Sequence, residues 1–200
     1  MKAAVAVKPA VATDVLPRDP DDPAIWVNRS DASRSLVLGT MKVAAPDGAL
    51  AVFGLDGKLR QLAKGPDRPN NVDVEYGLEL DATPTDIAVL TERLGRRLRV
   101  YAIAPDGSGV RDISAGTMPI LAGAPGDRGA PMGIGLYRRP KDGAIFSGFP
   151  VGCRWSSTTR SVPGSRVQAS PFGSSGATWP GVQARKWPSG YTAELAMSPS

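Results

Sequence analysis

The stretch ALAVFGLDG, residues 49–57, is an apolar run that ends in a turn signal. A short apolar run closed by Asp-Gly is typical of a β-strand that turns back into an antiparallel neighbour. The same pattern returns in LRVYAI, residues 98–103, and Asp106-Gly107 supplies the next turn. A further apolar run precedes each of these strands, at residues 36–40 and 87–90. The sequence therefore predicts two similar groups of antiparallel strands.

These two groups follow one another at a nearly constant spacing. Leu38 and Val89 are 51 residues apart, Phe53 and Tyr101 are 48 apart, and the two Asp-Gly turns are 50 apart. A period near fifty residues made of short strands predicts blades of a β-propeller. A third copy begins at residues 134–137 and continues at 144–146. The alternative is an antiparallel sandwich with evenly spaced hairpins.

The strand pattern stops after Phe146. Residues 147–200 contain no Asp, are rich in Ser, Gly and Pro, and show no strand or helix period. Such a composition offers little apolar surface for packing and predicts a disordered or poorly packed tail. We therefore expect an all-β domain over residues 1–146 and a tail over residues 147–200. The tail also resembles GC-rich coding sequence translated in the wrong frame, a hypothesis that the nucleotide sequence tests.

The composition excludes several classes of function. Without histidine, the chain has no His-based zinc site and no Ser-His-Asp triad. The single cysteine, Cys153, cannot form an internal disulfide. The apolar runs are shorter than the roughly 18 residues of a membrane span, and a charge and a proline at Lys8-Pro9 interrupt the apolar start, so we predict neither a membrane segment nor an export signal. The net charge of +5 is concentrated in the tail and gives little support for a nucleic-acid partner.

Two stretches offer oxygen ligands for a cation. Asp19, Asp21 and Asp22 lie within four residues, ahead of a strand expected at residues 24–27. Carboxylates this close repel unless water or a cation surrounds them, and Ca²⁺ or Mg²⁺ prefers such oxygens. Asn70-Asn71-Val72-Asp73 supplies amide, carbonyl and carboxylate oxygens before another strand. For either stretch alone, a solvated turn is the alternative.

Two basic residues occupy equivalent places in the repeats. Lys42 follows the strand at residues 36–40, and Arg93 follows the strand at 87–90. If the repeats are blades, both side chains emerge on one face, where they could bind phosphate. We expect Arg96, Arg97 and Arg99 to be solvated or packed along their stems. Acidic and basic groups on one face predict a site where bound cations meet a polyanion, such as a highly phosphorylated small molecule.

Six stretches of the chain, within residues 5–146, resemble the opening blades of the β-propeller phytases in order and spacing. They are DPDDPAIWV (19–27), LVLGTMK (36–42), VFGLDGK (52–58), RPNNVDV (68–74), DIAVLTER (86–93) and RVYAI (99–103). The resemblance implies an incomplete form of a six-bladed propeller, with about the first two to three blades. It also implies a Ca²⁺-dependent hydrolase that releases phosphate from phytate, myo-inositol hexakisphosphate, through a metal-activated water. Members of that family are typically secreted or periplasmic.

Carried over residue by residue, the resemblance implies catalytic roles for Asp21, Asp22, Lys42 and Arg93, of which Lys42 and Arg93 bind phosphate. It implies that Asp21 and Asp22 ligate calcium and that Asp22 also serves a structural ion beside the carbonyls of Pro23 and Val72, and Asp19 adds a further carboxylate to these metal ligands.

The chain departs from the family in two places. Met132 stands where the family usually has a phosphate-contacting tyrosine, and the family's later blades have no counterpart after Phe146. We therefore expect an incomplete site with weak or no activity. Alternatives are a non-catalytic fragment that binds calcium or a polyphosphate, another metal-dependent propeller hydrolase acting on lactones or phosphotriesters, and a basic tail that binds nucleic acid.

Overall fold

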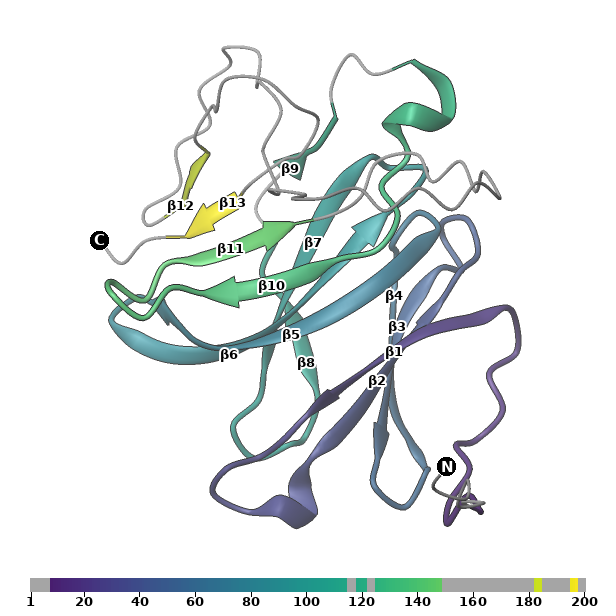
Figure 1. Cartoon of the computed structure of the whole chain (residues 1–200). Coiled ribbons are helices and arrows are strands. Elements are labelled where there is room, and N and C mark those ends of the chain that lie inside the picture. Colours follow the sequence, from purple (N-terminus) through teal and green to yellow (C-terminus); the bar gives the residue numbers. More distant parts are fainter. Residues whose placement is uncertain (1–7, 115–117, 122–124, 149–181, 185–194, 198–200) are drawn as a thin grey trace, which may run out of the picture.

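The structure is a computed structural model that describes residues 8–114, 118–121, 125–148, 182–184 and 195–197. In these residues β-strands dominate, with short 3-10 helices at η1 (Ala32–Arg34) and η2 (Gly126–Gly129) (Figure 1). No helix in the described part of the chain is both long and apolar enough to span a membrane. The all-β prediction is confirmed.

The first sheet is an antiparallel meander of four strands in sequence order. Its strands are β1 (Pro20–Trp26), β2 (Leu36–Met41), β3 (Ala49–Gly54) and β4 (Leu59–Lys64). Apolar residues at every position of β3 bury both of its faces, and the Asp56-Gly57 turn leads into β4, with Gly57 at a φ of 77°. A φ of this sign suits glycine because it has no Cβ.

The second sheet repeats this meander. Its strands are β5 (Pro69–Leu80), β6 (Thr83–Glu92), β7 (Arg97–Ile103) and β8 (Val110–Asp112), and β9 (Met118–Pro119) also pairs with β7. Leu38 and Val89 lie on β2 and β6, and Phe53 and Tyr101 lie on β3 and β7. The repeat predicted from spacing is therefore confirmed, with one antiparallel sheet built on a four-stranded meander in each copy.

The third sheet begins with the hairpin expected from the third copy. It contains β10 (Gly135–Arg138), β11 (Ile145–Gly148), β13 (Leu195–Met197) and β12 (Val182–Ala184), in that spatial order. The last two come from the stretch predicted to be a poorly packed tail, and the remainder of that stretch after residue 148 lies outside the described residues. The described residues form consecutive sheets that resemble propeller blades, and these sheets do not form a closed ring.

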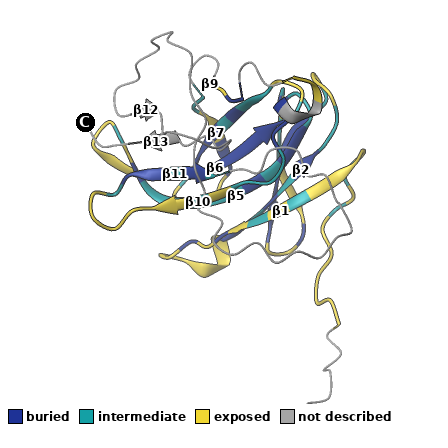
Figure 2. Cartoon of the chain, turned by 45° about the horizontal axis from the view of Figure 1, so that its top comes forward, coloured by how far each residue is buried: buried dark blue, intermediate teal, exposed yellow. Residues whose placement is uncertain are grey.

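The second sheet is buried on both faces because it lies between the other two (Figure 1). Ala88 and Leu90 pack into a cluster with the first sheet, whereas Ile87 and Val89 pack into a cluster that includes Ile145 of the third. Alternate residues of a strand point to opposite faces, so the apolar run of β6 fills both clusters. Figure 2 shows the C-terminal part of β6 as buried, while much of β1 and β10 is exposed.

Polar side chains tie the first two sheets together at their edges. The Gln61 side chain of β4 donates to the carbonyl of Val110 at 2.9 Å and accepts its N–H at 2.8 Å. This side-chain amide thus makes the two hydrogen bonds to β8 that the backbone of a paired strand would make. Trp26 of β1 donates its indole N–H to Asp86 of β6 at 2.8 Å. These bonds add directional contacts to a largely apolar interface.

We expect Gln61→Leu to lower the free energy of unfolding by about 2 kcal/mol, because both backbone groups of Val110 lose their partner at a half-buried edge. Urea unfolding of the full chain measures this change. The neighbouring Arg60→Gln removes only an exposed ion pair and is the control, with an expected change of about 0.5 kcal/mol or less. Equal midpoints for the wild type and Gln61→Leu would contradict the proposed edge contact.

Candidate functional site

The predicted site residues lie on one rim of the first two sheets, where β1 and β5 begin and β2 and β6 end. Pro20 pairs with Met41, the residue before Lys42, and Pro69 pairs with Glu92, the residue before Arg93. Lys42 and Arg93 therefore occupy equivalent places, as the spacing predicts. We call this edge the site rim; it comprises residues 19–23, 40–43, 65–72 and 91–96.

A β-bulge occurs at the same point of both repeats. The register shifts between Pro20 and Pro23 on β1 and between Pro69 and Val72 on β5. Asp21-Asp22 thus corresponds to Asn70-Asn71, an equivalence that sequence analysis missed when it treated the two stretches separately. The spacing of 49 residues between Pro20 and Pro69 is the signal that could have found it. Bulges re-aim side chains, which suits a site at a strand end.

A buried threonine holds each bulge. Thr40 accepts the N–H of Asp22 at 3.1 Å, and Thr91 accepts the N–H of Asn71 at 3.3 Å. Thr40 also donates its hydroxyl to the carbonyl of Asn70 at 2.7 Å, which connects the two bulges. Both threonines are fully buried. Sequence analysis did not single them out, although Thr40 ends the apolar run at residues 36–40 and Thr91 directly follows the run at 87–90.

The structure brings Asp22 and Val72 together. The Asp22 carboxylate accepts the N–H of Val72 at 3.1 Å across the boundary between the sheets. Asp19 instead uses its backbone carbonyl, which accepts the N–H of Lys42 at 2.9 Å, and its side chain is exposed. Within the described residues, no three acidic or cysteine side chains gather closely enough to hold a metal ion. The metal roles of Asp19, Asp21, Asp22, Pro23 and Val72 stay predictions.

The two basic residues differ in their surroundings. Lys42 forms an ion pair with Asp21, with 2.8 Å between Nζ and Oδ1. The residue equivalent to Asp21 in the second repeat is Asn70, which carries no charge. Accordingly, the guanidinium of Arg93 has no acidic partner among the described residues, and this side chain is half-buried. Arg93 is thus the more available of the two for an anion.

A buried charge network lies directly beside Arg93. Glu92 is fully buried and forms ion pairs with Arg97, at 2.5 Å, and with Arg99. Arg99 also pairs with Asp112 at 2.7 Å and donates to the carbonyl of Gly65 at 3.3 Å. The expectation that Arg97 and Arg99 are merely solvated or stem-packed is wrong, because a buried carboxylate requires charged partners. The network joins the β6–β7 turn to the β4–β5 connection.

Two groups in or beside this network, Tyr101 and Asp112, have shifted pKa values. Burial raises the pKa of Tyr101, whose hydroxyl is enclosed without a hydrogen-bond partner, and the nearby Asp112 carboxylate adds to this effect. Burial alone would also raise the pKa of Asp112, but hydrogen bonds from Ser114 and Arg99 outweigh it, and the pKa lies below its usual range.

Asp73 and Met132, singled out from the sequence, lie towards the third sheet. The Asp73 carboxylate accepts the N–H of Leu136 at 2.8 Å and the N–H of Val74 at 2.8 Å, so both of its oxygens have backbone partners. Asp73 therefore joins β5 to β10. Met132 is half-buried ahead of β10 and has no hydroxyl to offer at the position where the family usually has tyrosine.

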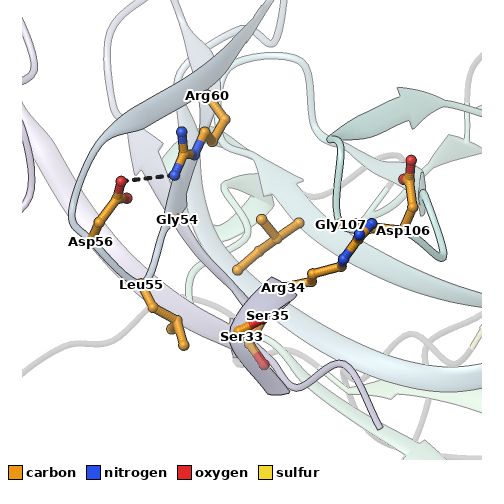
Figure 3. Close-up of a pocket in the computed structure, with 10 residues that line it drawn as sticks. Ser33, Arg34, Ser35, Gly54, Leu55, Asp56, Arg60, Asp106 and Gly107 are labelled. Atoms are coloured by element: carbon orange, nitrogen blue, oxygen red, sulfur yellow. Dashed lines mark hydrogen bonds and ion pairs between the residues drawn. The ribbon is translucent and has the colours of Figure 1, made fainter. Parts of the chain in front are cut away.

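A pocket of about 300 Å³ lies at the opposite strand ends (Figure 3). It is lined by η1, the β3–β4 turn and the β7–β8 turn, through Ser33, Arg34, Ser35, Leu36, Gly54, Leu55, Asp56, Arg60, Asp106 and Gly107. Its guanidiniums have acidic partners, since Arg60 pairs with Asp56 at 2.8 Å and Arg34 with Asp31 at 3.2 Å. The site rim is therefore the better candidate for binding an anion.

Comparison with known families matches residues 3–149 to the family described as Phytase. The chain belongs to the phytase family. The match ends close to Phe146, where the strand pattern of the sequence stops. A search of curated proteins finds 32% identity over 130 residues with the 3-phytase of Bacillus subtilis (strain 168), which covers 64% of this chain and 31% of that protein. The chain thus spans about a third of this curated phytase.

We expect Thr40→Val to lower the free energy of unfolding by about 2–3 kcal/mol, since it leaves the N–H of Asp22 and the carbonyl of Asn70 without partners. Thr91→Val breaks one longer bond and should cost less. Thr40→Ser keeps the hydroxyl and is the matched control. Thermal and urea unfolding measure the order, and a Thr91→Val loss larger than that of Thr40→Val would contradict it.

We expect Asp112→Asn to flatten the acid side of the stability profile. Because the pKa of Asp112 is lowered in the folded chain, its contribution is fully present above its unfolded pKa, near 3.8, and is lost as the pH falls through the lower folded value. The difference in unfolding free energy between wild type and variant should be constant above about pH 5 and shrink towards pH 3. A constant difference down to pH 3 would contradict this assignment.

Proposed function

We propose that the site rim is part of a Ca²⁺-dependent phytase site that releases phosphate from phytate. The observation that supports this most directly is the arrangement of two acidic residues, Asp21 and Asp22, beside two basic residues, Lys42 and Arg93, on one rim of a phytase-family chain. Hydrolysis of a phosphate ester needs charge stabilisation around the phosphoryl group and an activated water. Neither requires histidine.

The residues at the bulges suit a hard divalent cation. Their donors are oxygens, which Ca²⁺ prefers, and the side-chain oxygen of Asn70 is buried without a hydrogen-bond donor. Asp21 and Asp22, with the carbonyls of Pro23 and Val72, would hold the ion, and Asn70 would add an amide oxygen. A bound Ca²⁺ supplies positive charge next to the phosphate and lowers the pKa of a coordinated water.

The protein's own groups have separate tasks in this proposal. Arg93 binds a phosphate through its planar guanidinium, which matches two phosphate oxygens at once. Lys42 acts as a point charge, and Asp21, its ion-pair partner, holds it at the rim. Asp22 is held by Val72 and by the Thr40 contact to its N–H, which fixes the direction of its carboxylate.

A second candidate function is a non-catalytic fragment that binds calcium or a polyphosphate. It is favoured by Met132, which offers no hydroxyl where the family usually has a phosphate-contacting tyrosine. Family membership favours phosphate monoesters over lactones or phosphotriesters as substrates. The two remaining candidates share the same ligands and differ only in turnover.

We expect phosphate release from phytate in the presence of Ca²⁺ and its loss on addition of a chelator. Asp22→Asn and Arg93→Gln should each lower the rate by about 100-fold, because each removes a charge from the reacting centre. Asp56→Asn, at the opposite strand ends, is the matched control and should keep the rate. Malachite-green detection of free phosphate measures these rates.

Calorimetry of Ca²⁺ and phytate binding to the same variants separates the two candidates. Binding that depends on Asp22 and Arg93 without phosphate release would support the non-catalytic fragment. Release that is indifferent to the chelator and to both substitutions would overturn the proposed site.

A further inference from the structure

Arg68 lies between the two basic residues of the site rim. It stands in the connection from β4 to β5, and its N–H donates to the carbonyl of Val43 at 3.0 Å. Its own carbonyl accepts the N–H of Arg93 at 3.0 Å. The backbone of Arg68 is therefore bonded on one side to the residue after Lys42 and on the other side to Arg93. The Arg68 side chain therefore begins between Lys42 and Arg93, the two residues predicted to bind phosphate.

The guanidinium of Arg68 has no protein partner among the described residues. Its Nε is buried without an acceptor, whereas the residue as a whole is half-buried. By contrast, Arg97 and Arg99, beside the rim, pair with Glu92, and Lys42 on the rim pairs with Asp21. A guanidinium carries five N–H donors, and enclosing one without an acceptor is costly. An oxyanion would supply the missing acceptor.

The backbone of Arg68 is also strained. Its φ is 54°, a left-handed conformation that is unfavourable for a residue with a Cβ. Pro69 follows, and a residue before proline normally prefers an extended conformation. Strain of this kind persists where the surroundings or a functional role require it. Here it coincides with an unpaired basic side chain.

We propose that Arg68 is a further phosphate-contacting residue of the site rim, whose guanidinium binds oxygens of the phosphate group held by Arg93 and Lys42. This inference rests on the proposed function, since it requires that the rim bind a phosphate. A phosphate fits better than a single carboxylate because its tetrahedral oxygens can meet several donors from different directions. The assignment needs no bound metal, because neither Arg68 nor Arg93 has an acidic partner in the described ranges of the chain.

The test is titration of the full chain with inorganic phosphate in metal-free buffer, followed by calorimetry. Arg68→Gln and Arg93→Gln should each weaken the dissociation constant by about tenfold, as expected for loss of one charge-assisted contact. Arg68→Lys keeps the charge but loses the fork, so its affinity should lie in between. Arg111→Gln, an exposed arginine on β8, makes the same change in net charge and should alter the affinity by less than about twofold.

Arg68→Gly separates a binding role from a structural one. Glycine tolerates a φ of 54°, so the thermal midpoint should stay level or rise while phosphate affinity falls. A lower midpoint with unchanged affinity would make Arg68 a structural residue and overturn the inference. Wild-type affinity in Arg68→Gln, with weakened binding in Arg93→Gln, would overturn the inference and leave the proposed site standing. A wild-type chain that binds no phosphate in this buffer would overturn the inference, whereas the proposed function is overturned separately, by the Ca²⁺-dependent release assay.

Discussion

Burial of the second sheet on both faces is the constraint on which the rest of the structure depends. Ala88 and Leu90 need the first sheet as a cover, and Ile87 and Val89 need the third, so the sheets must stack side by side. Stacking two meanders of the same topology brings their equivalent strand ends to the same rim. Core packing therefore places Lys42 and Arg93 on the same rim. The chemistry of the rim then depends on which side chains occupy the equivalent positions of the two repeats.

The bulges at the rim give the two repeats a shared backbone with different chemistry. Thr40 and Thr91 hold the N–H of the second bulge residue in each repeat, and Thr40 extends this to the carbonyl of Asn70 in the neighbouring sheet. A hydroxyl suits this place because it donates and accepts at once. The same frame presents two carboxylates in the first repeat and two amides in the second. The two repeats therefore differ in the charge of these side chains, whereas the same β-bulge sets where the side-chain oxygens lie in both.

The repeat of about fifty residues predicted the fold because the strands and turns of a meander have local sequence signals, namely an apolar run followed by an Asp-Gly turn. It also placed Lys42 and Arg93 on one rim, since equivalent positions in repeats share a place in the fold. The bulge equivalence, the threonine contacts and the network around Glu92 did not follow from the sequence. The bulges and the Glu92 network depend on the register between neighbouring strands of one sheet, and the bond from Thr40 to Asn70 depends on how two sheets stack. Glu92 shows the difficulty, because its equivalent in the first repeat is the buried Met41, and the pattern around both residues is similar.

The differences between the repeats account for the polarity of the rim. In the first repeat Asp21 neutralises Lys42, whereas in the second the equivalent pair is Asn70 and Arg93, so the charge of Arg93 has no acidic partner within the part of the chain that the structure describes. The acidic residues of the rim are Asp19, Asp21 and Asp22 in the first repeat, Asp67, whose carboxylate accepts the N–H of Ala45 at 3.1 Å, and Glu92, whose charge is taken up by Arg97 and Arg99. The rim consequently has an oxygen-rich side that suits a cation next to a guanidinium-rich side that suits an anion. Two repeats with identical rim residues would not separate acidic from basic side chains in this way. The sequence differences between the repeats therefore make the rim a candidate site for a cation and a phosphate together.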